Sequence, residues 1–472
     1  MSMPARPSRD GHLPRSLPLE SPARAATLAA IACALLFGAH AVLLPHTHMS
    51  TVCAIDFGTS NSAIALVQSD RSRLVELEPG HDTMPTAVFY AVEGLSGVQE
   101  PELSYGRAAV AAYVDGVEGR LMRSMKSILG STLAEQATEV GGGHSVRYLD
   151  VIATYLRHLR RRAEQAAGQA PDQLVLGRPV FFVDEDPQRD ADAQSALEAA
   201  ARQVGFKQVQ FQYEPIAAAL DFEATVDAEQ LVLVADIGGG TSDFSLVRVG
   251  PDRRQRLDRR DDILANHGVH VAGTDFDRLI ELAHLLPTCG YRGIGPSGRE
   301  VPNRVYFDLA TWHLINTVYA PARMAELRSM KSFYADPKHH ARLMTVLELR
   351  LGHALTALAE EAKITVASSA SARVKLHQLD QDLHVLLDQA AAMASIDGSL
   401  QCIAEAARAT TDMAGITAAQ VDAVYFTGGS TGLRALSQRI ASQFPQARAV
   451  YGNRFASVVQ GLGQHAANLY LR

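Results

Sequence analysis

The hydrophobic pattern of the chain alternates between short apolar runs and longer segments with helical spacing. Five apolar runs have the length and composition of buried strands: Val52 to Phe57, Leu174 to Val183, Leu231 to Ile237, Phe244 to Val249 and Val421 to Phe426. Four segments carry apolar residues at intervals of three and four among good helix formers: Arg189 to Val204, Pro215 to Phe222, Leu343 to Ala367 and Ser395 to Met413. This alternation predicts an α/β fold with mixed sheets. The Gly- and Pro-rich stretch from Pro287 to Pro302 is expected to be a loop.

One pattern occurs twice: an apolar strand, an acidic residue, a Gly/Thr turn and a second apolar strand. The first copy has Asp56 followed by Gly58-Thr59-Ser60-Asn61. The second has Asp236 followed by Gly238-Gly239-Gly240-Thr241-Ser242-Asp243. Two such hairpins far apart in the sequence predict a duplicated domain whose halves face each other across a cleft.

The composition of these turns indicates phosphate binding. Glycine has no Cβ atom, so backbone N–H groups and neighbouring hydroxyls can approach phosphate oxygens closely. Asp56 and Asp236, at the ends of the first strands, could hold Mg²⁺ through its water shell, because hard cations prefer oxygen ligands. Each turn taken alone is also compatible with an ordinary β-hairpin.

A third element follows near the C-terminus, where the strand ending at Thr427 runs into Gly428-Gly429-Ser430-Thr431. Such a turn can accept a nucleoside along its backbone and offer a helix N-terminus to an anion. Many strand-to-helix connections contain two glycines, so the signal is specific only in order behind the two hairpins.

Together the three elements resemble the superfamily of actin, sugar kinases and heat-shock chaperones. Three stretches resemble the ATPase domain of the seventy-kilodalton (DnaK-type) chaperones in particular: Glu214-Pro215-Ile216-Ala217-Ala218-Ala219, Met125-Lys126-Ser127-Ile128-Leu129-Gly130, and Arg178-Pro179-Val180-Phe181-Phe182 with Gln188-Arg189. The resemblance covers nearly all of Met49 to Arg472 and is greatest to the short YegD-like branch. It implies an α/β, actin-like ATPase fold with two duplicated ribonuclease-H-like lobes around a nucleotide cleft. Lobe I is expected at 49–230, lobe II at 231–452, and a C-terminal helix returning to lobe I at 453–472.

The resemblance also implies roles for individual residues. Lys126 would stabilise charge on the transferred phosphoryl group, Thr241 would contact the γ-phosphate, and Asp236 would hold the metal shell or the water. Asp243 would support ion binding with Asp56 and Asp236, and Glu214 would link the metal's water shell to the hinge helix. ATP or ADP would contact Gly58, Thr59, Ser60, Asn61, Gly238, Gly239, Gly240, Glu360, Lys363, Gly428, Gly429 and Ser430. The residues do not say whether K⁺ joins Mg²⁺, as it does in that family.

Four positions depart from the family at the expected adenine pocket. Ile364 stands where the chaperones have a base-stacking arginine and Ala367 where they have a hydroxyl; Gly432 replaces a second arginine, and Phe455 an acidic residue. Both cationic faces for the base are therefore expected to be lost. Stacking of a guanidinium contributes about 0.5–2 kcal/mol, so ATP binding could weaken by about one to three orders of magnitude. Base selectivity is an open question.

Charge and cysteine usage restrict the partners and the compartment. A formal net charge of −7 argues against a general affinity for nucleic acid. The arginines between Arg253 and Arg260 are mixed with Asp252, Asp258, Asp261 and Asp262 and are expected to form a solvated surface turn. Cys33, Cys53, Cys289 and Cys402 have neither zinc-ligand nor disulfide-framework spacing. They are expected to be small buried hydrophobes in a reduced, cytoplasmic protein.

Residues 1–48 form an extension whose apolar run from Ala25 to Leu44 has the length of a membrane span. Read literally, it is a signal anchor, and only then would the protein be attached to a membrane. Alternatively Met49, directly before the first core strand, is the true start.

Three functions remain open from the sequence. The first is a slow, chaperone-like ATPase switch without a peptide-binding domain, whose outer lobes could bind a protein partner that senses the nucleotide. The second is a small-molecule kinase of the sugar-kinase type, although no dedicated acceptor motif is evident. The third is a catalytically silent nucleotide-binding scaffold, suggested by Ile364 and Gly432.

Overall fold

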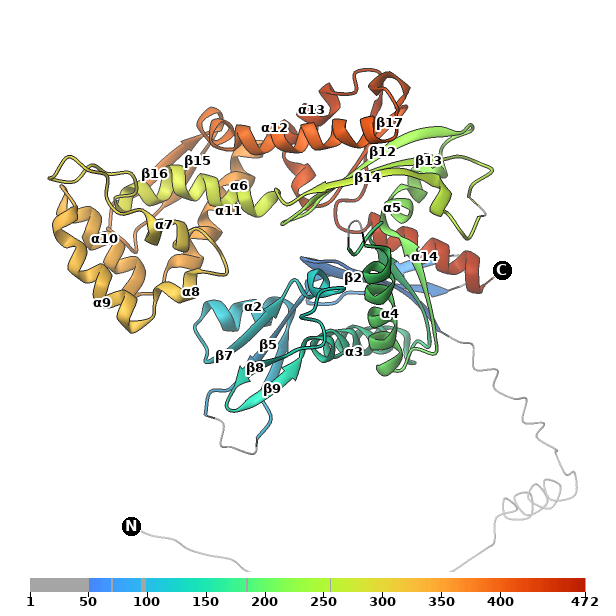
Figure 1. Cartoon of the computed structure of the whole chain (residues 1–472), viewed down its shortest axis with the longest axis horizontal. Helices are drawn as coiled ribbons and strands as arrows, with labels where there is room; N and C mark the ends of the chain where they lie inside the picture. The colour runs from blue at the N-terminus through green and yellow to red at the C-terminus, as the bar shows by residue number, and fades with distance from the viewer. Residues whose placement is uncertain (1–50, 69–70, 95–98, 184–185, 255, 472) are drawn as a thin grey trace, which may run out of the picture. The chain divides into compact units, whose positions relative to one another are not determined.

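The computed structural model describes residues 51–68, 71–94, 99–183, 186–254 and 256–471 (Figure 1). The expected N-terminal extension, residues 1–48, lies outside the described residues, as does Cys33. Within the described segments, no helix combines the length and the hydropathy needed to cross a membrane.

Two sheets organise the described part of the chain. The first sheet has the order β11-β10-β1-β2-β3, with β4 paired to β2. Its strands are β1 Val52–Phe57, β2 Asn61–Gln68, β3 Arg71–Leu74, β4 Thr83–Pro85, β10 Gln173–Arg178 and β11 Gln208–Tyr213. The second sheet has the order β14-β13-β12-β17-β18. Its strands are β12 Gln230–Ile237, β13 Ser242–Val249, β14 Ile263–Val269, β17 Ala423–Thr427 and β18 Arg448–Tyr451.

The two sheets repeat one topology. In the first, β1 pairs antiparallel with β2 and parallel with β10. In the second, β12 pairs antiparallel with β13 and parallel with β17. The outer pairs correspond as well, since β2–β3 and β13–β14 are antiparallel whereas β10–β11 and β17–β18 are parallel. The repeated sequence pattern thus corresponds to a repeated five-strand arrangement.

Helices cover both faces of each sheet (Figure 1). One face of the first sheet packs against α3 Tyr148–Ala167 and α4 Pro187–Gln203. Between the two sheets lie α5 Glu214–Glu223 and α14 Ser457–Tyr470, whose apolar side chains share one core with the inner faces of both. The outer face of the second sheet packs against α6 Gly273–Ile280, α11 Gly352–Ser368, α12 Gln389–Met413 and α13 Arg434–Ser442.

Smaller elements extend each half. Beside the first sheet are the sheet β6-β5-β7 with α2 and the hairpin β8–β9. Their bounds are β5 Ala87–Ala91, β6 Glu102–Tyr105, α2 Gly106–Val114, β7 Gly119–Arg123, η1 Met125–Ile128, β8 Ala137–Gly141 and β9 His144–Arg147. Beyond the second sheet are η2 Arg260–Asp262, η3 Glu281–Leu285, η4 Leu286–Cys289, α7 Arg304–Leu309, α8 Ile315–Val318, α9 Pro321–Ser329, η5 Met330–Phe333, α10 Pro337–Glu348, β15 Ser371–Lys375, β16 His384–Asp388, η6 Ala418–Gln420 and η7 Gly429–Gly432.

The periodicity of β1 and β12 places Asp56 and Asp236 on corresponding faces of the two sheets. Successive side chains of a strand point to opposite faces. In β1, Val52 and Ala54 belong to the core between the sheets, so Asp56 shares their face. In β12, Val232 and Val234 belong to that core, so Asp236 does too. Both carboxylates therefore point toward the space between the sheets, where α5 begins.

Most of the expected elements are confirmed, and β1 has the expected bounds. Two expected elements are wrong in extent. The expected strand Leu174 to Val183 ends at Arg178, because Pro179 has no N–H group to continue the ladder. The expected helix Leu343 to Ala367 is two helices, α10 and α11, separated at Arg350, whose φ of 53° is left-handed. The expected loop from Pro287 to Pro302 contains only the end of η4 and a single bridge between Ile294 and Glu300.

The arginine-rich turn is only partly solvated, which corrects the sequence-based expectation. The side chain of Arg259 is 2% exposed, and its Nη2 lies 2.9 Å from Oε1 of Glu223 at the end of α5. Arg259 and Arg253 both also pair with the buried Asp262. A buried carboxylate such as Glu223 requires a partner charge. The turn therefore holds the end of α5 through a buried ion-pair network.

Two of the three described cysteines agree with the expectation of buried thiols, and Cys402 departs from it. Cys53 and Cys289 are buried and free, and Cys402 is half-buried and free.

Candidate functional site

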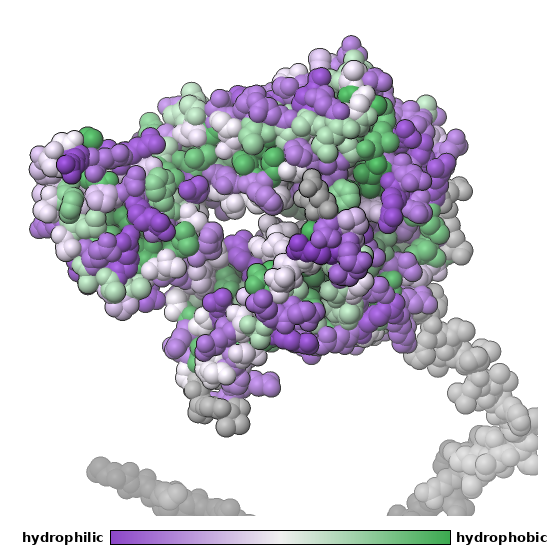
Figure 2. Space-filling view, in the orientation of Figure 1, coloured by the Kyte–Doolittle hydropathy of each residue, from purple (hydrophilic) through white to green (hydrophobic). Residues whose placement is uncertain are grey.

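A cavity of about 1120 Å³ opens between the two sheets, and every site residue expected from the sequence lines it. The space-filling view shows the molecular surface hollowed between the segments that carry α11 and β2 (Figure 2). The cavity brings together side chains and turns that are up to several hundred residues apart in the sequence. The roles expected for these residues stay predictions, but their convergence is a property of the fold.

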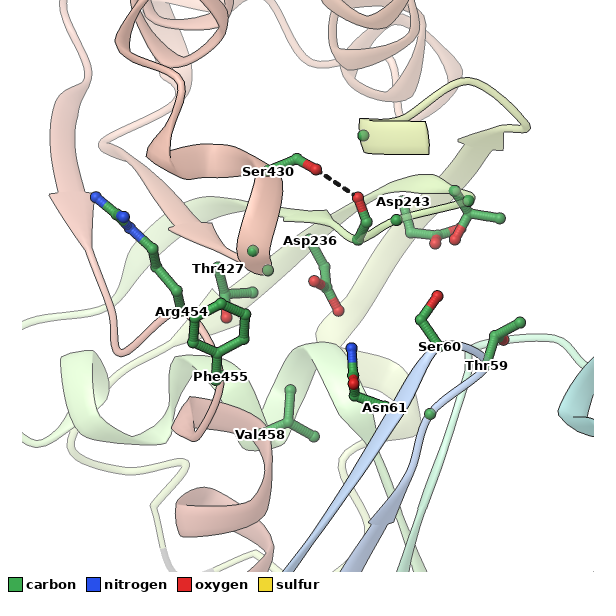
Figure 3. A pocket seen from close by; sticks show the side chains of 18 of the residues that line it. Thr59, Ser60, Asn61, Asp236, Asp243, Thr427, Ser430, Arg454, Phe455 and Val458 are labelled. Carbon is green, nitrogen blue, oxygen red and sulfur yellow. Dashed lines mark hydrogen bonds between the residues drawn. The ribbon is translucent and has the colours of Figure 1, made fainter. Parts of the chain in front are cut away.

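The two glycine turns face each other across the cavity (Figure 3). A Cβ atom at Gly58 would lie 2.3 Å from the carbonyl oxygen of Asn61, so the first turn is tight enough to require glycine. A Cβ at Gly239 would lie 3.3 Å from Oγ of Ser60, which places the second turn directly opposite the first. An anion between them would meet backbone N–H groups and hydroxyls from both turns.

The second turn is held by hydrogen bonds to two neighbouring elements. The hydroxyl of Ser430 donates to the carbonyl oxygen of Gly238 at 2.6 Å (Figure 3). Thr274, at the start of α6, donates through its hydroxyl to the carbonyl oxygen of Gly239 at 2.8 Å. A Cβ at Gly273 would lie 2.4 Å from Oγ of Ser430. The turn, the N-terminus of α6 and the double-glycine turn are therefore in direct contact.

The double-glycine turn also packs on the end of β12. Gly428 has a φ of 84°, and a Cβ there would lie 2.4 Å from the carbonyl oxygen of Ile237 and 2.6 Å from Oδ1 of Asp236. Any larger residue would be strained and would collide with the Asp236 carboxylate. Glycine at this position thus lets the third sequence element reach the acidic centre of the cavity.

One buried cation lies among the acidic groups. Nζ of Lys126, in η1, is 2.5 Å from Oε1 of Glu214, the first residue of α5. Pro215 at the start of this helix has a suitable φ, and the negative charge of Glu214 is favourable at a helix N-terminus. Burial alone lowers the pKa of Lys126, but Glu214 and Asp56 outweigh it, so the pKa is raised. Lys126 is therefore a charged, fixed ammonium group.

The carboxyl groups around Lys126 outnumber the one positive charge that it supplies. Burial, and then Glu214, raise the pKa of Asp56 to about 8. Burial, and then Asp243, raise the pKa of Asp236 to about 7. The pKa of Asp243 is also raised by burial, although a hydrogen bond with Thr241 opposes this. Such a cluster favours a cation that supplies the missing positive charge.

The donor set fits a hydrated Mg²⁺ better than a directly ligated metal. Among the described residues, no three His, Cys, Asp or Glu side chains converge closely enough to ligate one ion. Asp56, Asp236 and Asp243 line one cavity with room for water between them. Mg²⁺ usually keeps several of its waters and binds through few carboxylates. These three residues would hold it largely through water.

Lys363 and Glu360, expected to contact the nucleotide, project into the same cavity from α11. The ammonium group of Lys363 lies 2.7 Å from Oδ1 of Asp277 and donates to the carbonyl oxygen of Gly273 at 3.2 Å. Burial raises the pKa of Asp277 to about 6, although Lys363 opposes this. In this structure Lys363 thus fixes the start of α6 against α11.

The structure corrects the expectation that both cationic faces are lost at the other end of the cavity. A Cβ at Gly432 would lie 2.6 Å from Nη1 and 3.0 Å from Cζ of Arg454. The guanidinium of Arg454 therefore occupies the space that the missing side chain at position 432 leaves. Ile364, Ala367 and Phe455 line this end as well.

Several lining residues were missed by sequence reasoning. They are Asn266, His270, Gly273, Thr274, Asp277 and Arg454. The start of α6 had one available signal, the sequence Gly273-Thr274-Asp275-Phe276, in which Asp275 accepts a hydrogen bond from the N–H of Ala272 at 3.0 Å. No sequence signal pointed to Arg454, because no local pattern relates this residue to Gly432.

An aromatic cluster joins the two halves away from the phosphate turns. The rings of Tyr113, Trp312 and His353 lie with centroids 5.1 Å apart in each pair. The guanidinium of Arg123 lies 4.2 Å from the centroid of Trp312. Tyr113 and Arg123 belong to α2 and β7, whereas Trp312 follows α7 and His353 is in α11. The cluster therefore bridges the segments on either side of the cavity.

Acid is expected to weaken this cluster through His353. Its two ring nitrogens are buried without a hydrogen-bond partner, and burial, then Arg123, lower its pKa to about 4. Between pH 6.5 and 4 the unfolded chain binds a proton there that the folded chain does not, so this contribution to stability falls as pH falls. The unfolding midpoint of the wild type should therefore fall relative to that of His353→Phe by about 2 °C between pH 7 and pH 5.

The measurement can use the fluorescence of Trp312, since the chain contains one tryptophan. Comparing the two proteins at each pH cancels the opposite effect of the buried carboxylates, whose raised pKa values destabilise the fold as pH rises. A difference between the two midpoints that does not change with pH would contradict the assignment.

Comparison with known proteins gives one family. Residues 52–286 match the family model described as Hsp70 protein. A chaperone protein HscA homologue from Shewanella amazonensis is 31% identical over 255 residues, which cover 50% of this chain and 37% of that protein. HscA homologues from Haemophilus influenzae and Methylobacillus flagellatus are 29% and 30% identical over 248 and 256 residues, covering 37% and 39% of those proteins. The chain thus matches well under half the length of these relatives.

Proposed function

The chain belongs to the Hsp70 family through residues 52–286, with an actin-like ATPase fold, and from this premise we propose that it binds Mg-ATP between its two sheets and hydrolyses it slowly. The observation that carries the proposal is the convergence of both glycine turns, the double-glycine turn and the Lys126 cluster on one cavity. Members of this family bind ATP or ADP with Mg²⁺ as chaperones.

The phosphate groups would lie between the two glycine turns. Backbone N–H groups of Gly58 to Asn61 and of Gly238 to Thr241, together with the hydroxyls of Thr59, Ser60 and Thr241, would donate to phosphate oxygens. Bound Mg²⁺ would neutralise part of the phosphate charge. Gly428 and Gly429 would leave the nucleoside room along the third turn, with Ser430 holding that turn to Gly238.

Lys126 and the aspartates would have different roles in the hydrolysis. The ammonium group of Lys126, held by Glu214, would stabilise negative charge as the terminal phosphoryl group transfers, which is a preorganised electrostatic effect. Asp236 would orient the attacking water by accepting a hydrogen bond from it. The hydroxyl of Thr241, which donates to Asp243 in this structure, would donate to the transferring group instead when nucleotide is bound.

A nucleotide-dependent change would reach the outer surface through α5. Glu214 begins this helix at the cavity, and Glu223 ends it in the buried network with Arg259. The helix packs against both sheets through the core that it shares with α14. A shift of Lys126 and Glu214 on hydrolysis would therefore alter how the two halves contact each other, and a protein partner on the outer surface could sense it.

The test combines binding with turnover. Calorimetry should show that Mg-ATP binds to the purified protein, and phosphate should be released without an added acceptor. Thr241→Ala should lower the rate of release about a hundredfold and retain binding, because it removes one donor to the transferring group. Thr132→Ala, at an exposed turn outside the cavity, should leave the rate unchanged.

Three outcomes would contradict the proposal. Absence of binding at millimolar Mg-ATP would exclude a nucleotide site. Binding without any turnover would favour the silent scaffold, and formation of ADP only with an added hydroxyl acceptor, without free phosphate, would favour the kinase.

A further inference from the structure

The outer surface of α3 is strongly basic over its second half. The helix packs on the face of the first sheet that lies opposite the core shared with the second sheet (Figure 1). Between residue 157 and its last residue, Ala167, it carries one acidic residue, Glu164. The same stretch carries four arginines, none of them buried: Arg157, Arg160, Arg161 and Arg162. We refer to these four side chains as the α3 basic surface.

No carboxylate among the described residues forms an ion pair with the α3 basic surface. Arg160 donates through Nε to the carbonyl oxygen of Pro171 at 2.9 Å, and Arg162 donates through Nη2 to the carbonyl oxygen of Glu76 at 3.0 Å. Arg157 and Arg161 form neither a hydrogen bond nor an ion pair within the described segments. The positive charge of this surface is therefore not neutralised by the protein itself.

Two neighbouring side chains respond to this positive charge. The ring of His158 stacks on that of Tyr105 with centroids 4.1 Å apart. Burial, and then Arg162 and Arg161, lower the pKa of His158 to about 4. Burial raises the pKa of Tyr105, and Arg161 and Arg157 oppose this. A surface that disfavours a cation on one neighbour and favours an anion on the other is suited to attract anions.

Two further basic side chains lie near the end of α3. Arg73, in β3, is exposed and donates through Nη2 to the carbonyl oxygen of Ala166 at 3.2 Å. Lys207 is exposed and lies 3.2 Å from Oδ2 of Asp172. An exposed ion pair of this kind is weak and leaves the ammonium group free to meet another anion. The positive charge thus continues from the helix to the segment that follows it.

The described fold begins at this same end of α3. The backbone N–H of Asp172 donates to the carbonyl oxygen of Thr51 at 3.2 Å, and the side-chain amide of Gln169 donates to the hydroxyl of Thr51. The apolar run from Ala25 to Leu44 ends seven positions before Thr51. Seven residues of extended chain span at most about 25 Å. Whatever holds the apolar run is therefore close to the end of the α3 basic surface.

We propose that the α3 basic surface binds the anionic headgroups of a lipid bilayer. Lys and Arg side chains near an anionic membrane surface each strengthen binding by a factor of about five. Nucleic acid and acidic proteins would also be attracted by the charge. The apolar run favours the bilayer, because its length suits a hydrocarbon core and it joins the fold beside this surface. The proposal does not depend on the nucleotide site.

The acidic character of the whole chain does not oppose this contact. The formal net charge is −7, but the Debye length at physiological ionic strength is about 8 Å, so a bilayer at α3 senses mainly the local charge. The acidic cavity is farther away, since β1 runs from Val52, beside Thr51, to Asp56 and its neighbour Phe57. The five residues from Thr51 to Asp56 span about 17 Å of strand. Attachment through α3 would therefore leave the cavity accessible.

The test is a titration of the full chain with two kinds of vesicle, measured by flotation. One kind is neutral phosphatidylcholine, and in the other about a third of the lipid is anionic phosphatidylglycerol. The wild type should bind the anionic vesicles about a hundredfold more tightly, and added salt should reduce this preference. Replacing two arginines together, Arg157→Gln with Arg161→Gln, should weaken binding to anionic vesicles about twentyfold and leave binding to neutral vesicles unchanged.

A conservative variant separates charge from geometry. Arg157→Lys with Arg161→Lys should retain the preference for anionic vesicles, because attraction to headgroups depends on the charge rather than on the planar fork of arginine. Neither side chain has a hydrogen bond or an ion pair within the described segments, so both double variants should unfold at the wild-type midpoint. Loss of binding in the lysine variant would overturn the proposal in favour of a site that requires guanidinium groups.

Arg373→Gln with Arg434→Gln is the matched control. It removes the same charge from two exposed positions of the other half, in β15 and at the start of α13. Its binding to both kinds of vesicle should equal that of the wild type, and an equal loss in this control would overturn the proposal. Equal affinity of the wild type for neutral and anionic vesicles would do the same. Binding to duplex DNA or polyglutamate without binding to anionic vesicles would assign the surface to another polyanion and refute the bilayer.

Discussion

Replacing Lys126 by alanine is expected to lower the rate of ATP hydrolysis about a hundredfold to a thousandfold, with nucleotide still bound. Lys126 is the buried ammonium group of a cluster that contains Asp56, Asp236, Asp243 and Glu214. Without it, negative charge that develops on the phosphoryl group would face these acidic groups with no fixed cation. The pKa of Asp56 would rise further, because Lys126 at present lowers it.

The chain contains a matched control for this change. Lys331 occupies the same tripeptide, Met-Lys-Ser, and is likewise in a 3₁₀ helix, η5 Met330–Phe333, but its side chain is exposed. Lys331→Ala should leave hydrolysis and nucleotide affinity unchanged. Single-turnover phosphate release at saturating Mg-ATP separates the chemical step from binding. Turnover by Lys126→Ala at the wild-type rate would exclude Lys126 from the reaction.

Gly461→Ala is expected to destabilise the protein by about 3 kcal/mol, the largest effect on folding that we predict. A Cβ at Gly461, in α14, would lie 1.9 Å from the carbonyl oxygen of Ala217 and 2.6 Å from its carbonyl carbon. The obstacle is the backbone of α5, which cannot rotate aside as a side chain could. The two helices would have to separate within the core that both sheets share.

The same substitution at another helical glycine, Gly398→Ala, is expected to have the opposite effect on stability. Gly398 is exposed in α12, and a Cβ there would meet nothing within 4 Å. Alanine favours a helix over glycine by about 1 kcal/mol, so this variant should be slightly more stable than the wild type. Urea unfolding of the two variants provides the comparison. A wild-type midpoint for Gly461→Ala would show that α5 and α14 do not pack as closely as described.

Lys126 and Gly461 both contact the same helix, α5. Lys126 pairs with Glu214 at the start of α5, and Gly461 is where α14 crosses α5. The crossing has no side chain between the helices, so they touch backbone to backbone. Any change of the cavity that moves Glu214 would therefore be transmitted to the helix that packs on both sheets.

Local patterns in the sequence were sufficient for the phosphate end of the site. Asp56 and Asp236 follow buried strands and precede glycine turns, and both the strand periodicity and the demand for glycine act over a few residues. The repeat of this pattern also predicted the repeated topology. Family resemblance, rather than spacing, added Lys126 and Glu214, which the structure then placed 2.5 Å apart.

The tertiary structure alone decided the features that depend on contacts between distant segments. Arg454 fills the space over Gly432 because the segment that follows β18 packs against η7 there, and no periodicity connects the two positions. Arg259 is buried because Glu223, at the end of another element, needs its charge. The rings of Tyr113, Trp312 and His353 come into contact only when the two halves of the molecule pack together. A sequence determines which faces of its own strands and helices are apolar, whereas the partner of each polar group depends on which elements pack against each other.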